Sequence, residues 1–392
     1  MDDEKRASAL KAFCIFGTRP EAIKMAPVIL QMQRFPELFQ PVVCVTGQHR
    51  QMLDQVLATF GVRPEHDFAL MTEDQTLAEL SVRVLGTMDA FLEDTRPDIV
   101  LVQGDTTSAF ITALAAFYRR IPVAHIEAGL RTGDFSHPFP EEANRVLIDR
   151  LATLCFAPTE LNRRALLAEG VPADRIFVTG NTGIDALLLV REKIHLRSAT
   201  HWEESWGGAL PVLEDPKSHI ILVTAHRRES FGKRMTDMFH ALRELAARHP
   251  DWHFIYPVHP NPNVIEPARN VLGNLPNLHL IAPLSYEPFV YLMDRSALIL
   301  TDSGGVQEEA PSLAKPVVVM REKTERVEAV ESGTVILAGN TGKGLVETVE
   351  RVAADPEIQR ALGRVRNPYG DGHAAEMIVG ILAQKYSARQ TS

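Results

Sequence analysis

Short apolar runs alternate with helix-like stretches along most of the chain, and this alternation constrains the fold more than any other feature. The runs form two series, separated by a polar segment at residues 194–218 that is rich in Trp, Gly, Glu and Pro. Such alternation is typical of parallel sheets covered by helices on both faces. The expected strands are residues 12–16, 42–46, 99–102, 123–126, 176–179, 220–224, 254–257, 278–281, 297–300 and 316–320, with helices at 75–92, 107–119 and 235–249. The sequence therefore predicts an α/β protein of two doubly wound, Rossmann-like domains with a ligand cleft between them.

Composition narrows the classes of function. The 392 residues exceed what one core organises, and the net charge of -9 argues against nonspecific binding to nucleic acid or to an anionic membrane. Residues 1–11 lack the apolar core of a signal peptide, and no apolar run reaches membrane-spanning length. The three cysteines lie in apolar runs, which is typical of small buried hydrophobes in a reducing compartment. We therefore expect a cytoplasmic protein.

Carboxylates follow two expected strands of the first series and begin one helix. Asp105 and Glu127 each stand at a strand end, and Glu141 follows Pro140. Simpler roles exist for two of them: Asp105 would cap the helix near residue 107, and Glu141 would pair with Arg145 one turn on. Three carboxylates at one edge of a sheet are, however, what proton-transfer chemistry requires.

The loop after the first strand carries positive charge. Arg19 and Lys24 follow residues 12–16, where they would contact an anionic ligand or, for Arg19, form a surface salt bridge. Pro27 predicts a kink or a late start of the helix that follows. The loop has neither the dinucleotide-binding glycine pattern nor a phosphate-binding Walker sequence.

The segment 300–310 predicts a phosphate-binding turn in the second series. Ser303, Gly304 and Gly305 lie between an apolar strand and a helical segment, where free amides and the helix dipole favour an anion. An ordinary strand-to-helix turn is the alternative. The glutamates that follow would suit the hydroxyls of a ribose.

Cationic and hydrogen-donating groups follow other strands of this series. His226 and Arg227 leave one strand, and His259 leaves the next. They suit a leaving phosphate, although solvated surface charges are the alternative. No cluster has metal-ligand spacing, so we expect neither a metal nor a cofactor.

These motifs together resemble the non-hydrolysing UDP-N-acetylglucosamine 2-epimerases, in order and from about residue 13 to near the C-terminus. The matching strings are 16–27, 46–55, 104–107, 127–133, 140–145, 226–232, 256–262, 301–312 and 367–372. The resemblance implies a glycosyltransferase-B-like architecture with the active site in the interdomain cleft. It implies an N-terminal domain of residues 1–193, with a segment of about 370–392 packing back on it, and a UDP-binding domain of residues 194–369.

The resemblance also implies a chemistry. The family interconverts UDP-N-acetylglucosamine and UDP-N-acetylmannosamine by eliminating UDP across carbons 1 and 2, holding 2-acetamidoglucal, and adding UDP back. Carried over by motif, Asp105, Glu127 and Glu141 are the acid–base and sugar-contact residues, and His226 assists at the diphosphate. The residues expected to hold UDP are Arg19, Lys24, Leu284, Phe289, Ser303, Gly304, Gly305, Glu309 and Arg326.

Regulation and assembly follow from the resemblance as well. It implies activation by a second substrate molecule at Gln48, Gln51, Arg83, Arg227 and His259, a homodimer, and a product that feeds surface polysaccharide synthesis. Gln103 departs from the family pattern, because a His is usual there, and Lys323 replaces a small residue.

Three other functions stay open at this point. A hydrolysing epimerase would release UDP and free N-acetylmannosamine. A glycosyltransferase would need an acceptor site, and a UDP-sugar sensor would have no use for three carboxylates together.

Overall fold

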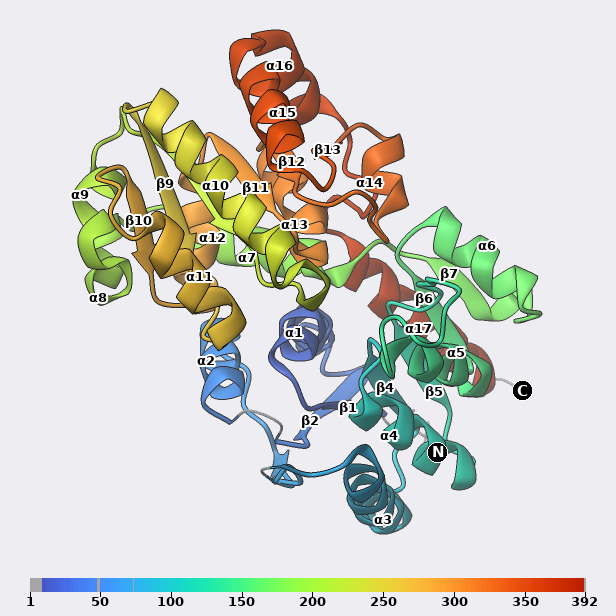
Figure 1. Ribbon diagram of the computed structural model, residues 1–392. Helices are drawn as coiled ribbons and strands as arrows, with labels where there is room; N and C mark the ends of the chain where they lie inside the picture. The colour runs from blue at the N-terminus through green and yellow to red at the C-terminus, as the bar shows by residue number, and fades with distance from the viewer. Residues whose placement is uncertain (1–8, 48–49, 73, 391–392) are drawn as a thin grey trace, which may run out of the picture. The chain divides into compact units, whose positions relative to one another are not determined.

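The computed structural model describes residues 9–47, 50–72 and 74–390. The chain forms two compact units, Met1–Ala186 with Tyr369–Ser392, and Leu187–Pro368 (Figure 1). Unit 1 is therefore built from both ends of the chain, whereas unit 2 is one continuous segment. Among the described residues, no helix has the length and apolar character that crossing a bilayer requires.

Unit 1 is organised around a parallel seven-stranded sheet in the order β3-β2-β1-β4-β5-β6-β7. β1 is central, with Cys14 opposite Val43 on one side and Leu101 on the other. The strands are β1 (Leu10–Phe16), β2 (Phe39–Val45), β3 (His66–Asp67), β4 (Ile99–Gln103), β5 (Val123–Ile126), β6 (Leu154–Ala157) and β7 (Ile176–Val178). The short apolar runs therefore form a parallel sheet, as predicted, and it is buried over most of its length.

Helices connect these strands and cover the sheet. They are α1 (Arg19–Gln33), α2 (Arg50–Phe60), α3 (Leu77–Thr95), α4 (Thr107–Tyr118), α5 (Glu141–Leu151), α6 (Glu160–Ala168) and α7 (Thr182–Ile194), which runs into unit 2. The C-terminal helix α17 (Ala374–Gln390) packs on α1. The carboxylate of Asp185 accepts hydrogen bonds from the amides of Ala374 and Ala375 (3.3 and 2.8 Å), so it fixes the start of α17.

Unit 2 repeats this plan with a parallel six-stranded sheet in the order β10-β9-β8-β11-β12-β13. Its strands are β8 (His219–Thr224), β9 (Trp252–Pro257), β10 (Leu278–Ile281), β11 (Leu298–Thr301), β12 (Val317–Val319) and β13 (Ile336–Leu337). Its helices are α8 (Glu203–Trp206), α9 (Leu210–Glu214), α10 (Lys233–Arg248), α11 (Pro262–Leu272), α12 (Tyr286–Arg295), α13 (Gly304–Glu309), α14 (Val327–Glu331), α15 (Gly342–Ala354) and α16 (Pro356–Arg364). The prediction of two doubly wound, Rossmann-like sheets is confirmed.

Of the two alternatives predicted for Pro27, the late helix start was wrong, and three strands were not predicted. α1 begins at Arg19 rather than late, because Thr18 and Glu21 form a capping box and Pro20 occupies the first turn, so Pro27 lies inside the helix. The strands β3, β6 and β13 were not predicted. β3 and β13 have two residues each, and β6 was hidden in a run that continues the preceding helix without a turn signal.

All three cysteines are free and buried, as expected. Burial raises the pKa of the Cys14 thiol to about 12 and raises the pKa of the Cys44 and Cys155 thiols as well. They behave as small apolar residues of the core.

Candidate active site

Glu127 is the most tightly held of the predicted catalytic residues. Lys24 from α1 and Asn181, which follows β7, donate to its Oε1 atom, the latter at 3.1 Å. Gln103 at the end of β4 donates to Oε2. The backbone of Glu127 has φ = +71°, a strained value for a residue with a side chain. Three other segments of unit 1 therefore converge on one carboxylate at a strained strand end.

Asp105 lies beside it, in the loop between β4 and α4. Its Oδ2 atom is 2.6 Å from Nη2 of Arg145, and 27% of its side chain is exposed. Burial raises the pKa of Asp105, Arg145 opposes this, and the nearby Glu127 and Glu141 raise it further. A raised carboxyl pKa moves the group toward the range in which it exchanges protons near neutral pH.

The structure does not support the helix-capping role of Asp105 or the helical ion pair of Glu141. Thr106, not Asp105, caps α4, because its hydroxyl accepts from the amide of Ala109. Arg145 pairs with Asp105 and, at 3.3 Å, with Glu142, so the predicted helical pair with Glu141 was wrong. Glu141 starts α5 as expected, and it lies near enough to Asp105 to help raise the pKa of that carboxyl.

Glu21 is a site residue that the sequence analysis missed. It is 2% exposed and accepts from the amides of Gly17 and Thr18 (2.9 and 2.6 Å) and from the hydroxyl of Thr106 (2.6 Å). Burial raises its pKa, and these hydrogen bonds partly offset the effect. Glu21 thus joins the start of α1, where Arg19 lies half-buried, to the loop that carries Asp105. The Thr-x-x-Glu capping pattern would have identified it.

In unit 2, the predicted phosphate turn begins α13. Ser303 is its N-cap residue and makes no side-chain cap hydrogen bond. A Cβ atom on Gly304 would lie 2.9 Å from Cζ of Arg326, so a side chain at this position would require the guanidinium to shift. Arg326 is itself held by Glu308, with 2.7 Å from Nε to Oε1. A Cβ on Gly305 would lie 3.9 Å from Oε1 of Glu309. The structure therefore brings Ser303, Gly304, Gly305, Glu309 and Arg326 together, and their role in holding UDP stays a prediction.

A buried carboxylate orders the loop after β8. Asp302 is fully buried, and its Oδ2 atom accepts from the amides of His226 and Arg227, both at 2.8 Å. Its Oδ1 atom lies 3.5 Å from Nδ1 of His226. The His226 ring is also nearly parallel to that of His259, with 5.7 Å between centroids. Residues predicted for two roles, catalysis and regulation, are thus neighbours.

The remaining predicted residues are described by their burial or by local contacts, except where they lie outside the described structure. Leu284 is buried after β10, and Phe289 is half-buried on α12. Arg83 on α3 donates to the carbonyl of Leu70 (3.1 Å) and to Gln75. Gln48 lies outside the described residues, as does the side chain of Gln51.

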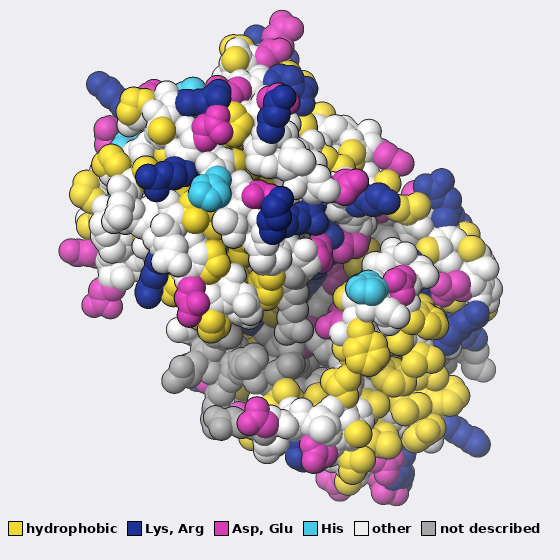
Figure 2. Space-filling model, in the orientation of Figure 1, with side chains coloured by type: hydrophobic (Ala, Val, Ile, Leu, Met, Phe, Trp, Pro, Cys, Tyr) yellow, Lys and Arg dark blue, Asp and Glu magenta, His cyan; other side chains and the backbone are white. Residues whose placement is uncertain are grey.

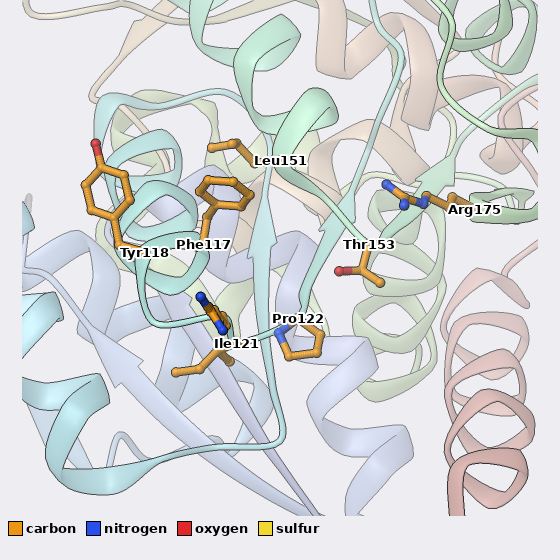
Figure 3. Close-up of a pocket in the computed structure, with 8 residues that line it drawn as sticks. Phe117, Tyr118, Ile121, Pro122, Leu151, Thr153 and Arg175 are labelled. Atoms are coloured by element: carbon orange, nitrogen blue, oxygen red, sulfur yellow. The ribbon is translucent and has the colours of Figure 1, made fainter. Parts of the chain in front are cut away.

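The described part of the chain holds no cluster of three or more His, Cys, Asp or Glu side chains suited to a metal. A cavity of about 600 Å³ is lined by Phe117, Tyr118, Pro122 and Arg175 among others (Figure 3). Pro122 precedes β5, whereas Glu127 follows it, so this cavity lies at the other end of the sheet. The predicted site occupies the carboxyl edge, where ligands of such sheets bind.

Fold and site together define a two-domain α/β enzyme of glycosyltransferase-B-like architecture. The family model described as UDP-N-acetylglucosamine 2-epimerase matches residues 32–383, and the chain belongs to this family.

Individual relatives agree over nearly the whole length. The chain is 51% identical to the UDP-N-acetylglucosamine 2-epimerase of Escherichia coli K12 over 95% of its length and 98% of that protein's. It superimposes on the crystal structure of the Neisseria meningitidis enzyme bound to UDP-GlcNAc with a TM-score of 0.88 and 47% identity, covering 96% of this chain and 100% of the other. The Methanocaldococcus jannaschii enzyme, solved with UDP-GlcNAc and UDP, gives 0.79 and 31%, covering 96% and 100%.

Proposed function

We propose that this protein interconverts UDP-N-acetylglucosamine and UDP-N-acetylmannosamine by eliminating UDP and adding it back. A base removes the proton on carbon 2, the bond from carbon 1 to UDP breaks, and 2-acetamidoglucal remains bound until UDP returns and a proton arrives on the opposite face. The observation that carries the proposal is the meeting of Asp105, Glu127 and Glu141 at one sheet edge, in a chain of this family.

The reaction needs proton-transfer groups on two faces of the sugar. Asp105 has a raised pKa and two carboxylate neighbours, which suits a group that changes protonation state during turnover. Glu127 faces the ammonium group of Lys24, which favours the ionised carboxylate that a base requires. Glu141 has no helical pair with Arg145 and completes the acid–base and sugar-contact set.

The leaving UDP needs positive charge and backbone amides. We assign its diphosphate to Ser303, Gly304, Gly305 and Arg326, with Arg19, Lys24 and His226 as further cationic or donating groups. Glu309 is assigned to the ribose hydroxyls, and Leu284 and Phe289 to the uracil ring. The contact of Gly304 with Arg326 supports the diphosphate assignment, because both would touch the same anion.

Substrate activation at Gln48, Gln51, Arg83, Arg227 and His259 is part of the proposal. It is supported by the contact between the His226 and His259 rings, which gives a ligand on His259 a direct route to the diphosphate group. Sigmoidal kinetics in UDP-N-acetylglucosamine, and activation of the reverse reaction by added UDP-N-acetylglucosamine, are expected. Hyperbolic kinetics with no such activation would remove this part of the proposal.

We also propose a homodimer, formed through an apolar face on unit 1. Hydrophobic side chains gather over α4 and α5 (Figure 2). Phe117, Tyr118 and Leu147 on these helices are 52, 61 and 45% exposed. Contiguous apolar surface of this kind marks association sites in soluble proteins, and a second copy of the same face would cover it symmetrically.

The dimer is tested by a matched pair of variants. Leu147→Glu should shift the protein from dimer to monomer in sedimentation velocity, because it buries a charge in the contact. Leu196→Glu, at an 87% exposed leucine in unit 2, should leave the dimer intact. A monomeric wild-type protein at micromolar concentration would refute the assignment.

The reaction is tested by proton NMR of UDP-N-acetylglucosamine with the protein in heavy water and no added cofactor. UDP-N-acetylmannosamine carrying deuterium at carbon 2 is expected. Free N-acetylmannosamine with UDP would identify a hydrolysing enzyme instead, and an unchanged spectrum without exchange would refute the proposal. We place the reaction in the cytoplasm, where its product would feed surface polysaccharide synthesis.

A further inference from the structure

His125, which no step of the proposed reaction uses, lies fully buried on β5, two residues before Glu127. Its Nδ1 atom is 2.6 Å from Oδ1 of Asp149, and its Nε2 atom is 2.7 Å from the carbonyl oxygen of Gly104. Both partners are hydrogen-bond acceptors, and a carbonyl cannot donate. The ring therefore donates from Nε2 to Gly104, and its Nδ1 atom faces the Asp149 carboxylate.

A network of charged residues surrounds this buried ring. Asp149 also accepts from Nη2 of Arg131 (2.7 Å) and from the amide of Gly129 (3.2 Å), and Arg131 is held in turn by Glu169 (2.7 Å). Burial alone would raise the pKa of Asp149, but His125 and Arg131 outweigh it and lower the pKa. The carboxylate that orients His125 is therefore itself paired and hydrogen-bonded, which is how a buried charge is tolerated.

The network ends on the peptide that carries the predicted catalytic Asp105. Gly104 has φ = +70°, and its amide donates to the carbonyl of Ile126 (3.1 Å). Its carbonyl is fixed by His125, while the carbonyl of Asp105 accepts from Nδ2 of Asn144 (2.9 Å). In a trans peptide the N–H points away from the C=O. Fixing the Gly104 carbonyl on the buried side therefore sets the direction in which Asp105 leaves the strand end.

We propose that His125 is a positioning residue: its ring, oriented by Asp149, donates to the Gly104 carbonyl and thereby fixes the orientation of the Asp105 carboxylate toward the sugar. The proposal rests on the proposed function and adds a residue to it. A core histidine that only satisfies its hydrogen bonds is the competing explanation, and it predicts a loss of stability without a specific loss of turnover.

Two amide substitutions separate the two hydrogen bonds of the ring. The amide nitrogen of Asn lies near the position of Nδ1, and that of Gln near the position of Nε2. His125→Asn thus keeps the donor to Asp149 and loses the one to Gly104, whereas His125→Gln keeps the donor to Gly104. The two variants have similar costs to the core, because each removes one charge-assisted hydrogen bond.

Turnover of UDP-N-acetylglucosamine is measured per folded molecule, with folded fractions from thermal melts. His125→Asn should lower kcat about 10- to 100-fold with little change in KM, the size expected for one charge-assisted hydrogen bond. His125→Gln should stay within about fivefold of wild type, since the bond to Gly104 survives. UDP affinity, measured by calorimetry, should be unchanged in both because the groups assigned to UDP lie mostly in unit 2.

Equal kcat in the two variants, or a lower value for His125→Gln, would overturn the inference while leaving the proposed function intact. An inactive wild-type protein would overturn both. Because the variants risk misfolding, ¹⁵N NMR of the wild-type protein gives a second measurement: Nε2 of His125 should carry a hydrogen that exchanges slowly with solvent. An Nε2 atom without a hydrogen would refute the bond to Gly104.

Discussion

The candidate site residues of the two units differ in charge and in how that charge is held. In unit 1 the predicted acid–base residues are carboxylates, and the pKa of Asp105 is raised by burial and by its carboxylate neighbours. Arg19 and Lys24 are the cations of this unit that are assigned to UDP. In unit 2 the candidate residues are mostly glycines and cations around the start of α13, with Arg326 fixed by Glu308. The residues assigned to proton transfer on the sugar therefore lie in unit 1, whereas most of those assigned to the departing anion lie in unit 2.

Proton transfer and diphosphate binding require different kinds of residue. Proton transfer needs a carboxyl group whose pKa is moved toward neutrality, which burial and like charges achieve. Holding a diphosphate needs fixed positive charge and close backbone approach, which Arg326 and Gly304 provide. Substitutions in the two units should therefore change different measured quantities.

Replacing a carboxylate of unit 1 by its amide should have the largest effect. Glu127→Gln removes the charge that accepts the proton while keeping the size of the side chain, so kcat should fall by about 10³-fold or more. UDP affinity, measured by calorimetry, should stay within about threefold because unit 2 is unchanged.

The matched control is Glu160→Gln, which removes a carboxylate exposed at the first turn of α6 in the same unit. It should leave kcat unchanged. A Glu127→Gln protein that loses UDP affinity in step with kcat would break the comparison, since it would place UDP binding on unit 1.

Gly304→Ala should produce the converse result. The added Cβ would meet Cζ of Arg326 at 2.9 Å and displace the guanidinium. The lost charge-assisted hydrogen bonds should weaken UDP binding by up to about 100-fold. Gly208→Ala is the control, because a Cβ there meets nothing within 4 Å. Unchanged UDP affinity in Gly304→Ala would show that the anion binds elsewhere.

The sequence identified most of the site because parallel strands deliver their carboxyl ends to one edge. Alternation of apolar runs predicted the sheets, and the residues after those runs included Asp105, Glu127 and Ser303. What it missed were partners distant in sequence. Asn181 reaches Glu127 across 54 residues, and Asp302 orders the loop of His226 across 76. No local pattern encodes such contacts, because tertiary packing alone creates them.

Substitutions of Gln103 measure how much its hydrogen bond to Glu127 contributes to turnover. Gln103→Leu removes the donor to Oε2 and leaves Lys24 and Asn181 on Oε1, so kcat should fall about 10-fold. Gln103→His introduces the residue usual in the family, and its Nε2 atom occupies nearly the same position. It should retain most of the turnover. If both variants lost activity equally, the shape of the Gln103 side chain, rather than its hydrogen bond to Glu127, would explain why glutamine is needed at this position.

The smallest expected effect is on the pH dependence of the free energy of unfolding. The pKa of a buried carboxyl group is raised in unit 1 and lowered in unit 2. Burial raises the pKa of Asp185 in unit 1 to about 6, although the amides of Ala375 and Ala374 partly oppose this. Burial would also raise the pKa of Glu325 in unit 2, but its hydrogen bonds to Arg321 outweigh it and lower the pKa to about 2. Each group therefore links the stability of its own unit to pH in a different range.

For Asp185, the folded state holds its proton more tightly than the unfolded chain. Its contribution to stability is complete below its ordinary pKa of 3.8 and is lost as pH rises through about 6. For Glu325, the contribution is complete above its ordinary pKa of 4.5 and is lost only as pH falls toward 2. Between pH 4.5 and 7.5, unit 1 alone should therefore respond to pH through these two residues.

Asp185→Asn removes the ionisable group from the contact with α17. Relative to this variant, the wild-type free energy of unfolding should fall by at most about 3 kcal/mol between pH 4.5 and 7.5, as two pKa units allow. Hydrogen exchange of the α17 amides after Ala375 measures the effect locally. Glu325→Gln should show no such difference over the same range, because Glu325 stays ionised throughout. If the difference in free energy of unfolding between wild type and variant changed with pH by the same amount and sign for Asp185→Asn and Glu325→Gln, protonation of Asp185 would not be what stabilises the contact with α17.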